Sequence, residues 1–266
     1  MGMNLVQAPE DLGLARFTFG FHDDFEFYVD TQRWTKVTPD SGTVTAGTTT
    51  AVGGLLTLDP GAGATTDDET YIHTTASLCL IADGKPMIAE ASVKWTEADT
   101  NKAAVAFGFA SGVAADFIQD GCVALAASFS GAGICKFKGD LVYSCFSSIG
   151  AVQTVTKTAI PSSNGAFHRL RVEIRPLTDT LAEVTFWYDA SGPQPGMPFT
   201  AVPPVSPVSN GGLQQFLDPT QTKASPIKHI ITYTGAAAMQ GMLGVKNGSG
   251  VKQTLISDYF DLWAKR

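Results

Sequence analysis

Short segments in which apolar and polar residues alternate run through most of this chain, and they constrain its fold more than any other feature. The clearest is the segment 167–175, where Leu170, Val172 and Ile174 alternate with arginine and glutamate residues. Successive side chains of a β-strand point to opposite faces of the sheet, so this pattern predicts a strand with one buried face. The segment 181–188 follows a polar turn, and the two segments predict a β-hairpin.

Further strands are expected along the whole chain. The segments 103–110 and 122–129 are largely apolar, as is typical of strands buried on both faces. The one helical candidate is 113–119, long enough for about one turn. The other expected strands, most of which alternate or follow a glycine turn, are 21–28, 55–58, 86–96, 227–234, 241–246 and 254–264.

Many short strands, glycine and asparagine turns and little helix predict an all-β fold, a two-sheet antiparallel sandwich. We expect helix in under about one-tenth of the chain, against the usual third. A sandwich of roughly 200–250 residues commonly forms one domain, so residues 21–266 are expected to be a single domain. Residues 1–20 are expected to form an N-terminal arm. Residues 192–226 are expected to form a long loop, rich in proline at 193, 195, 198, 203, 204, 207, 219 and 226.

Composition and charge exclude several functional classes. The net charge of −7 argues against direct nucleic-acid binding, which needs a basic surface. No apolar run is long enough for a transmembrane helix, and the first 20 residues do not have the pattern of a signal peptide. The four cysteines are not spaced as metal or redox motifs, and we expect them to be reduced and buried.

The alternating carboxylates of this chain bear on glycan hydrolysis, because retaining glycosidases need two acids about 5–5.5 Å apart. A strand that carried such a site would show three alternating acids, and this chain has only pairs: Asp24 with Glu26, Asp67 with Glu69, and Glu97 with Asp99. The third positions hold Tyr28, Tyr71 and Asn101. We therefore expect solvated strands at these pairs, no polysaccharide hydrolysis and no enzymatic activity.

The segment from Asp67 to His73 is the most suggestive for chemistry. If it is extended, Asp67, Glu69, Tyr71 and His73 share one face and could hold a hard cation. The alternative is a polar outer face of an edge strand, and no metal or cofactor is predicted.

The remaining histidines, His22, His168 and His229, stand alone, and the sequence has neither a nucleophile elbow nor a phosphate-binding loop. Tryptophans could stack on sugars if exposed, but the strand positions of Trp95 and Trp187 favour packing.

Both ends of the chain carry motifs that resemble a known fold family. At the start these are the segments 21–25, 30–34, 40–43 and 53–58, and at the end 244–248 and 257–262. They resemble the opening strands and the closing hairpin of concanavalin A-like jelly-roll domains. Within that group the chain resembles capsid cement or decoration proteins of tailed bacteriophages.

That resemblance implies a virion structural protein on the capsid surface, assembled in the host cytoplasm. Its implied partners are the major capsid protein and further copies of itself, as a homotrimer. Neither nucleic acid, nor a membrane, nor a small-molecule ligand is expected. The alternative is a lectin-like, glycan-binding jelly-roll module, and a hydrolase is a distant third.

Apolar residues in the arm and in the proline-rich loop are the candidate partner contacts, because partners of a jelly roll are commonly held by loops. The alternative is that these side chains pack on the protein's own sheets. The candidates are Met3, Leu5, Val6, Leu12, Leu14, Phe199, Val202, Val205, Phe216 and Leu217.

Overall fold

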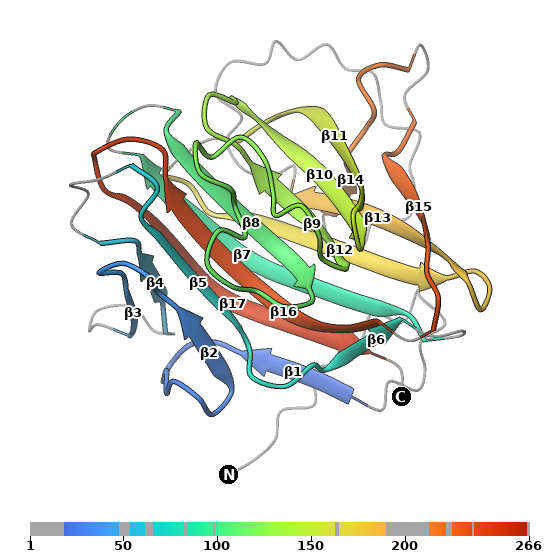
Figure 1. The fold of residues 1–266 in the computed structure, drawn as a ribbon, viewed down its shortest axis with the longest axis horizontal. Helices are drawn as coiled ribbons and strands as arrows, with labels where there is room; N and C mark the ends of the chain where they lie inside the picture. The colour runs from blue at the N-terminus through green and yellow to red at the C-terminus, as the bar shows by residue number, and fades with distance from the viewer. Residues whose placement is uncertain are drawn as a thin grey trace.

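A computed structural model describes residues 19–47, 54–61, 66–81, 85–97, 99, 101–162, 165–189, 213–221, 225–235 and 237–264 (Figure 1). The described residues form strands, turns and bends without any helix, which confirms the all-β prediction. The expected helical turn at 113–119 consists of turns and bends instead. Nothing in these residues is a helix that could cross a membrane.

Two antiparallel sheets make up the fold. The first, sheet A, has the order β14-β13-β12-β7-β17-β4-β3, with β1 paired to β17 and β15 to β13. Its strands are β1 (Phe19–Asp23), β3 (Thr43–Ala46), β4 (Leu56–Asp59), β7 (Met87–Glu97), β12 (His168–Pro176), β13 (Leu181–Asp189), β14 (Leu213–Gln215), β15 (Lys228–Thr232) and β17 (Gln253–Ala264).

The second, sheet B, has the order β11-β10-β9-β8-β16-β5-β2, with β6 paired to β16. Its strands are β2 (Trp34–Val37), β5 (Glu69–Thr74), β6 (Cys79–Ile81), β8 (Ala103–Ala110), β9 (Gly131–Lys136), β10 (Val142–Ile149), β11 (Val152–Pro161) and β16 (Ala237–Asn247). Figure 1 shows the long strands of the two sheets stacked face to face.

The main hydrophobic core lies between the sheets, and alternation builds it. On β12, Leu170, Val172 and Ile174 are almost fully buried in this core, as the sequence predicts. Between them, Arg171 and Glu173 point to the other face of sheet A. There the guanidinium of Arg171 lies 2.6 Å from the carboxylate of Glu90 on β7. The predicted hairpin is confirmed, because β12 and β13 pair along their length.

A second hydrophobic cluster covers the outer face of sheet B. The segment 111–130, between β8 and β9, places Phe117, Ile118 and Phe129 against that face. Small residues on the sheet leave room for it: a side chain at Gly244 would collide with the ring of Tyr71, 1.9 Å away. Every residue of β8 is therefore buried, which confirms the prediction of a strand covered on both faces.

The structure corrects two of the expected strands. Residues 122–129 were expected to be a strand, but they form turns and bends within the covering segment, apart from one isolated bridge at Leu125. Cys122, Leu125 and Phe129 of this stretch are buried by packing onto sheet B rather than by pairing within it. The strand expected at 21–28 ends at Asp23, because the chain turns at Phe25 with a φ of 54°.

Part of the predicted loop and most of the predicted arm lie outside the described residues. Within 192–226, the described residues begin with β14, which pairs with β13. The four cysteines are all buried, as expected, and no disulfide joins them in the structure.

Candidate functional site

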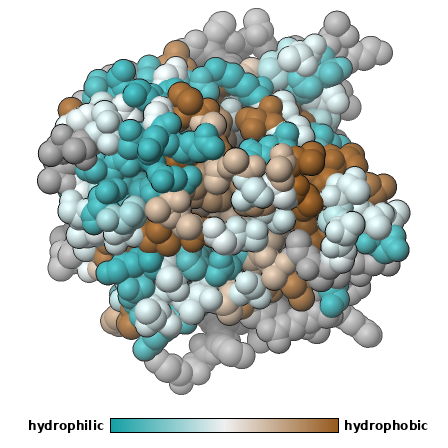
Figure 2. Space-filling model, in the orientation of Figure 1, coloured by the Kyte–Doolittle hydropathy of each residue, from teal (hydrophilic) through white to brown (hydrophobic). Residues whose placement is uncertain are grey.

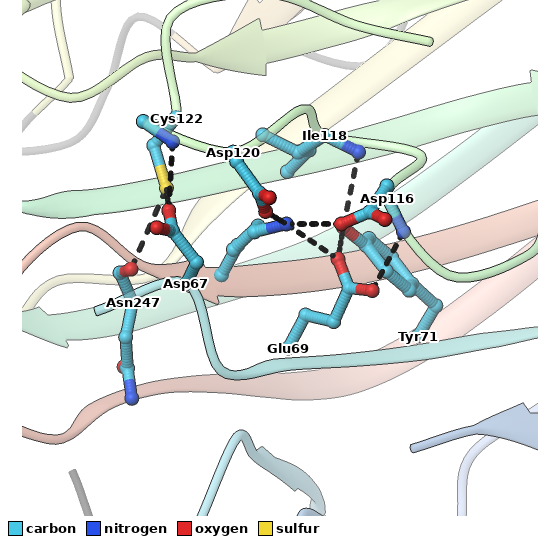
Figure 3. A network of polar contacts seen from close by, with 10 residues as sticks. Asp67, Glu69, Tyr71, Asp116, Ile118, Asp120, Cys122 and Asn247 are labelled. Carbon is cyan, nitrogen blue, oxygen red and sulfur yellow. Dashed lines mark hydrogen bonds and ion pairs between the residues drawn. The ribbon is translucent and has the colours of Figure 1, made fainter. Parts of the chain in front are cut away.

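The densest polar network in the described part of the chain joins sheet B to the segment 111–130 (Figure 3). At its centre is the ammonium group of Lys246 on β16, whose side chain is fully buried. Its nitrogen lies 2.8 Å from carboxylate oxygens of Asp116 and Asp120, and 3.1 Å from Glu69. Burial alone would lower the pKa of Lys246, but the hydrogen bonds to Asp116 and Asp120 outweigh it and raise the pKa. Lys246 is therefore charged at neutral pH.

Glu69 is the buried carboxylate of this network. It accepts hydrogen bonds from the Tyr71 hydroxyl at 2.7 Å and from the Asp116 backbone N–H at 2.6 Å. The Tyr71 oxygen in turn accepts one from the N–H of Ile118 at 3.0 Å. Burial raises the pKa of Glu69 above its ordinary value, and the contacts with Tyr71, Asp116 and Lys246 offset only part of that rise. Sheet B thus holds two backbone amides of the covering segment through adjacent side chains of β5.

A second anchor stands beside the first. The carboxylate of Asp67 accepts a hydrogen bond from the N–H of Gly121 at 2.7 Å, and the Cys122 thiol lies 3.7 Å away. That thiol also lies 3.5 Å from the carbonyl oxygen of Asn247. Burial raises the pKa of Cys122 to about 12, so the sulfur remains a neutral thiol and not a nucleophile.

Three non-glycine residues of these anchors have left-handed backbones. The φ angles are 80° at Asp67, 59° at Asp116 and 60° at Cys122. Such conformations cost free energy and persist where surrounding contacts enforce them. Here the hydrogen bonds of the two anchors are the contacts that enforce these conformations. They hold the segment 111–130 in one position on sheet B.

The arrangement around Lys246 argues against the cation site that was considered for the segment from Asp67 to His73. Glu69 and Tyr71 do share a face, but the ammonium of Lys246 occupies the position among the carboxylates. Asp67 faces the neighbouring anchor, and the His73 ring contacts the carbonyl oxygen of Thr74 at 3.1 Å. Within the described ranges, no group of three or more His, Cys, Asp or Glu side chains is arranged to hold a metal ion. The alternative, a polar outer face on an edge strand, is wrong as well, because β5 pairs on both sides and this face is covered.

Solved structures share this arrangement of strands. A lectin, UEA-II in complex with galactose, matches with a TM-score of 0.52 at 12% identity, over 94% of this chain and all of its own length (100%). The carbohydrate recognition domain of Emp46p in its potassium-bound form matches with 0.51 at 12%, over 91% of this chain and 94% of its own. The chain has a lectin-like jelly-roll fold.

An enzyme shares the jelly roll too. The endo-β-1,4-glucuronan lyase of the fungus Trichoderma reesei matches with a TM-score of 0.52 at 11% identity, over 93% of this chain and 95% of its own. At such identities the likeness concerns the fold alone, and the fold is compatible with both binding and catalysis. No family model matches the chain, and no curated protein matches its sequence.

The other two acid pairs lie in different surroundings. Glu97 is buried and bound to the ammonium of Lys136 at 2.5 Å and to the N–H of Asn101 at 2.7 Å. The Glu97 carboxylate therefore balances the buried charge of Lys136 and is not available as a catalytic acid. Asp24 and Glu26 are exposed beside a surface hollow in the β1–β2 connection.

One histidine meets a serine, but without the order that a catalytic triad needs. The ring nitrogens of His229 lie 2.9 Å from the Ser147 hydroxyl and 3.0 Å from that of Thr156. Since both nitrogens are taken by hydroxyls, no carboxylate orients this ring. Burial lowers its pKa to about 4, so His229 is neutral. His22 pairs with Asp261, and His168 stacks on Trp95.

Aromatic side chains also sort by burial. Trp34, Trp95 and Trp187 are buried, which confirms packing roles for Trp95 and Trp187. The strongly exposed aromatic is Phe27, at 82%. Sequence reasoning missed it because the alternation of 21–28 placed it in a strand.

The candidate partner contacts lie mostly outside the described residues, namely Met3, Leu5, Val6, Leu12, Leu14, Phe199, Val202 and Val205. Phe216 is fully buried, with its ring packed on Tyr188 and Tyr143 in the chain's own core. Its side chain is therefore not accessible to a partner, and it packs as the alternative expectation had it. Leu217, in contrast, is 40% exposed.

Proposed function

We propose that this jelly roll is a non-enzymatic docking protein of a virion, and specifically a decoration protein on the capsid lattice of a tailed bacteriophage. The observation that carries the docking role is the edge of sheet B at β11, whose outer side pairs with no other strand among the described residues. The phage assignment rests on the sequence resemblance described above.

Strand β11 is unusually long for an edge. It has ten residues, whereas the other terminal strands of the two sheet orders, β2, β3 and β14, have four, four and three. Among the described residues it pairs with β10 alone. An edge strand presents unpaired N–H and C=O groups that can add a strand from another chain.

Proteins that stay monomeric usually protect such an edge with charges or prolines. Here the strand carries one charged residue, Lys157, which is paired with Asp140 on the same chain, and one proline at its end, Pro161. Val152 and Val155 are 77% and 47% exposed. In Figure 2, hydrophobic residues are most frequent in the middle and right of the visible face, and hydrophilic residues are most frequent on the left and along the top. These features support attachment to other protein chains.

Particle binding tests the proposal. Phage particles that lack the chain are incubated with the protein, and its copy number on the sedimented particle is measured together with its position by cryo-EM. The variant carrying Val152→Lys and Val155→Lys is expected to lose binding to the particle, while its melting temperature stays at the wild-type value. Val251→Lys, at a 44% exposed position in the turn after β16, is the matched control. Wild-type occupancy of the double variant would refute docking through β11.

The proposal includes the absence of catalysis. Incubation with a panel of polysaccharides, polyglucuronate among them, is expected to yield no new reducing ends and no unsaturated products. Turnover that disappears on changing Glu26, Glu69 or Glu97 to glutamine would overturn this part.

A glycan-binding module is the second candidate, and the lectin and the carbohydrate recognition domain among the similar folds favour it. The two candidates separate in a simple pair of assays. A decoration protein co-purifies with particles, and a glycan-binding module binds a glycan array through an exposed aromatic side chain.

A further inference from the structure

A surface hollow of about 180 Å³ opens in the connection between β1 and β2. Its lining includes the exposed side chains of Asp24, Glu26, Phe27, Gln32 and Arg33, with buried Trp34 beneath them. A second cavity lies in the apolar core and measures about 10 Å³, which is space for one water at most. Of these two cavities, the β1–β2 hollow is the one with room for a small ligand.

The floor of this hollow is fixed by a buried carboxylate. Asp23 accepts hydrogen bonds from the indole N–H of Trp34 at 2.8 Å and the backbone N–H of Phe25 at 3.0 Å, and pairs with Arg33 at 3.2 Å. The Trp34 ring packs edge-on against Phe260 at 5.2 Å. Asp23 is therefore held by Trp34, and Trp34 is held in turn by the hydrophobic core.

The turn that presents Phe27 is also held in place. Phe25 has a left-handed backbone, and its carbonyl oxygen lies so close to Gly54 that a Cβ there would stand 2.0 Å away. Only glycine permits this approach. As a result Phe27 projects from a fixed turn with 82% of its surface in solvent.

The rim combines this aromatic face with groups that bind hydroxyls. The carboxylates of Asp24 and Glu26 accept hydrogen bonds, and the amide of Gln32 both donates and accepts. Arg33 adds a donor, and its guanidinium is positioned by the ring of Phe21, 4.5 Å from the ring centre. An aromatic ring with a negative face, ringed by such groups, matches a pyranose, whose C–H bonds lie on one face and whose hydroxyls lie around the edge.

We propose that the β1–β2 hollow binds a single sugar residue of a glycan, with the sugar stacked on Phe27 and its hydroxyls bonded to Asp24, Glu26 and Gln32. Anionic ligands such as phosphate are disfavoured by the two carboxylates. The volume is below the roughly 300–1,000 Å³ of pockets for larger organic ligands, as befits one ring of a longer chain. The inference gives the glycan-binding candidate a site and does not depend on docking through β11.

A glycan array carrying neutral hexoses, N-acetylhexosamines and uronic acids, probed with the full chain, identifies the best ligand. Titration calorimetry with that glycan then compares four variants. Phe27→Ala and Gln32→Ala are expected to weaken binding at least about tenfold, the factor that 1.4 kcal/mol represents. Phe27→Trp keeps the stacking surface, and Val123→Ala, at a 65% exposed position in the segment 111–130, is the matched control.

The three positions that these variants change are exposed, so melting temperatures are expected to stay at the wild-type value. Loss of binding in Phe27→Ala and Gln32→Ala, with retention in Phe27→Trp and Val123→Ala, supports the site. Absence of binding to every glycan overturns it, and so does binding that Phe27→Ala leaves intact. If Phe27→Ala abolishes attachment to particles but no glycan binds, the hollow is a protein contact and the inference is wrong. Failure of the β11 variants alone bears only on docking.

Discussion

Replacing Lys246 with methionine tests whether the network around it holds the segment 111–130 on sheet B. Methionine fills most of the buried stem but removes the ammonium group. Glu69, 2% exposed, then loses its ion partner and keeps the Tyr71 hydroxyl and one backbone amide. Removing one partner of a buried ion pair costs about 3–5 kcal/mol.

The lower end of that range applies here. Two hydrogen bonds remain on Glu69, and the contributions of Asp116 and Asp120 are screened because their side chains are 63% and 73% exposed. We therefore expect Lys246→Met to lower the free energy of unfolding by about 3 kcal/mol. In a chain of this size that corresponds to roughly 6–12 °C in melting temperature.

Urea unfolding followed by tryptophan fluorescence measures the loss. Lys157→Met is the matched control: it breaks an exposed pair with Asp140, which contributes under about 1 kcal/mol. Adding Glu69→Gln to Lys246→Met removes the uncompensated carboxylate and is expected to restore part of the stability. If Lys246→Met loses no more than Lys157→Met, or if the second change restores nothing, the reasoning about this network is refuted.

Three further predictions concern packing, pH and assembly. Gly244→Ala is expected to cost about 1–3 kcal/mol or more in thermal unfolding, because the new Cβ meets the Tyr71 ring at 1.9 Å; Gly20→Ala, with its nearest atom at 3.8 Å, should cost less. In the folded protein the pKa of His229 is about 4, below its ordinary 6.5. The contribution of the neutral ring to the free energy of unfolding is therefore complete above pH 6.5, and about 3 kcal/mol of it is lost as the pH falls towards 4. Asp261, whose pKa burial raises to about 6, acts in the opposite direction over the acid range, so the difference in pH profile between wild type and His229→Gln isolates the histidine. Light scattering is expected to give a trimer of 28.0 kDa subunits, and Leu217→Ser to weaken it without unfolding the domain; a monomer at micromolar and higher concentrations counts against the trimer.

How much of the fold could be predicted follows from the physics of each strand. β12 and β13 were predictable because one face is buried and the other carries polar residues, and alternation records that difference. β9 and most of β10 are buried on both faces. They combine small residues (Gly, Ala, Cys and Ser) with a few large side chains, so apolar and charged residues do not alternate along them. The segment 122–129 was mistaken for a strand because a loop packed in a core has the same hydrophobicity as a buried strand.

The polar network was predictable only in part. The shared face of Glu69 and Tyr71 follows from their spacing on one strand. Lys246, which decides against a cation there, is far away in the sequence and carries no local signal of its role. The roles of Asp116 and Asp120 could not be predicted, because the sequence around them indicates only a short helical turn.

The covering of β8 on both faces has a consequence for the exchange of its amide hydrogens. One face is sealed by the core between the sheets and the other by the segment 111–130. Amides in such a strand exchange with deuterium mainly through global opening, whereas a segment attached by side-chain anchors opens with a smaller free energy. The slowest amides of β8 and the amides of Ile118 and Gly121 therefore report two different opening reactions within one labelling experiment.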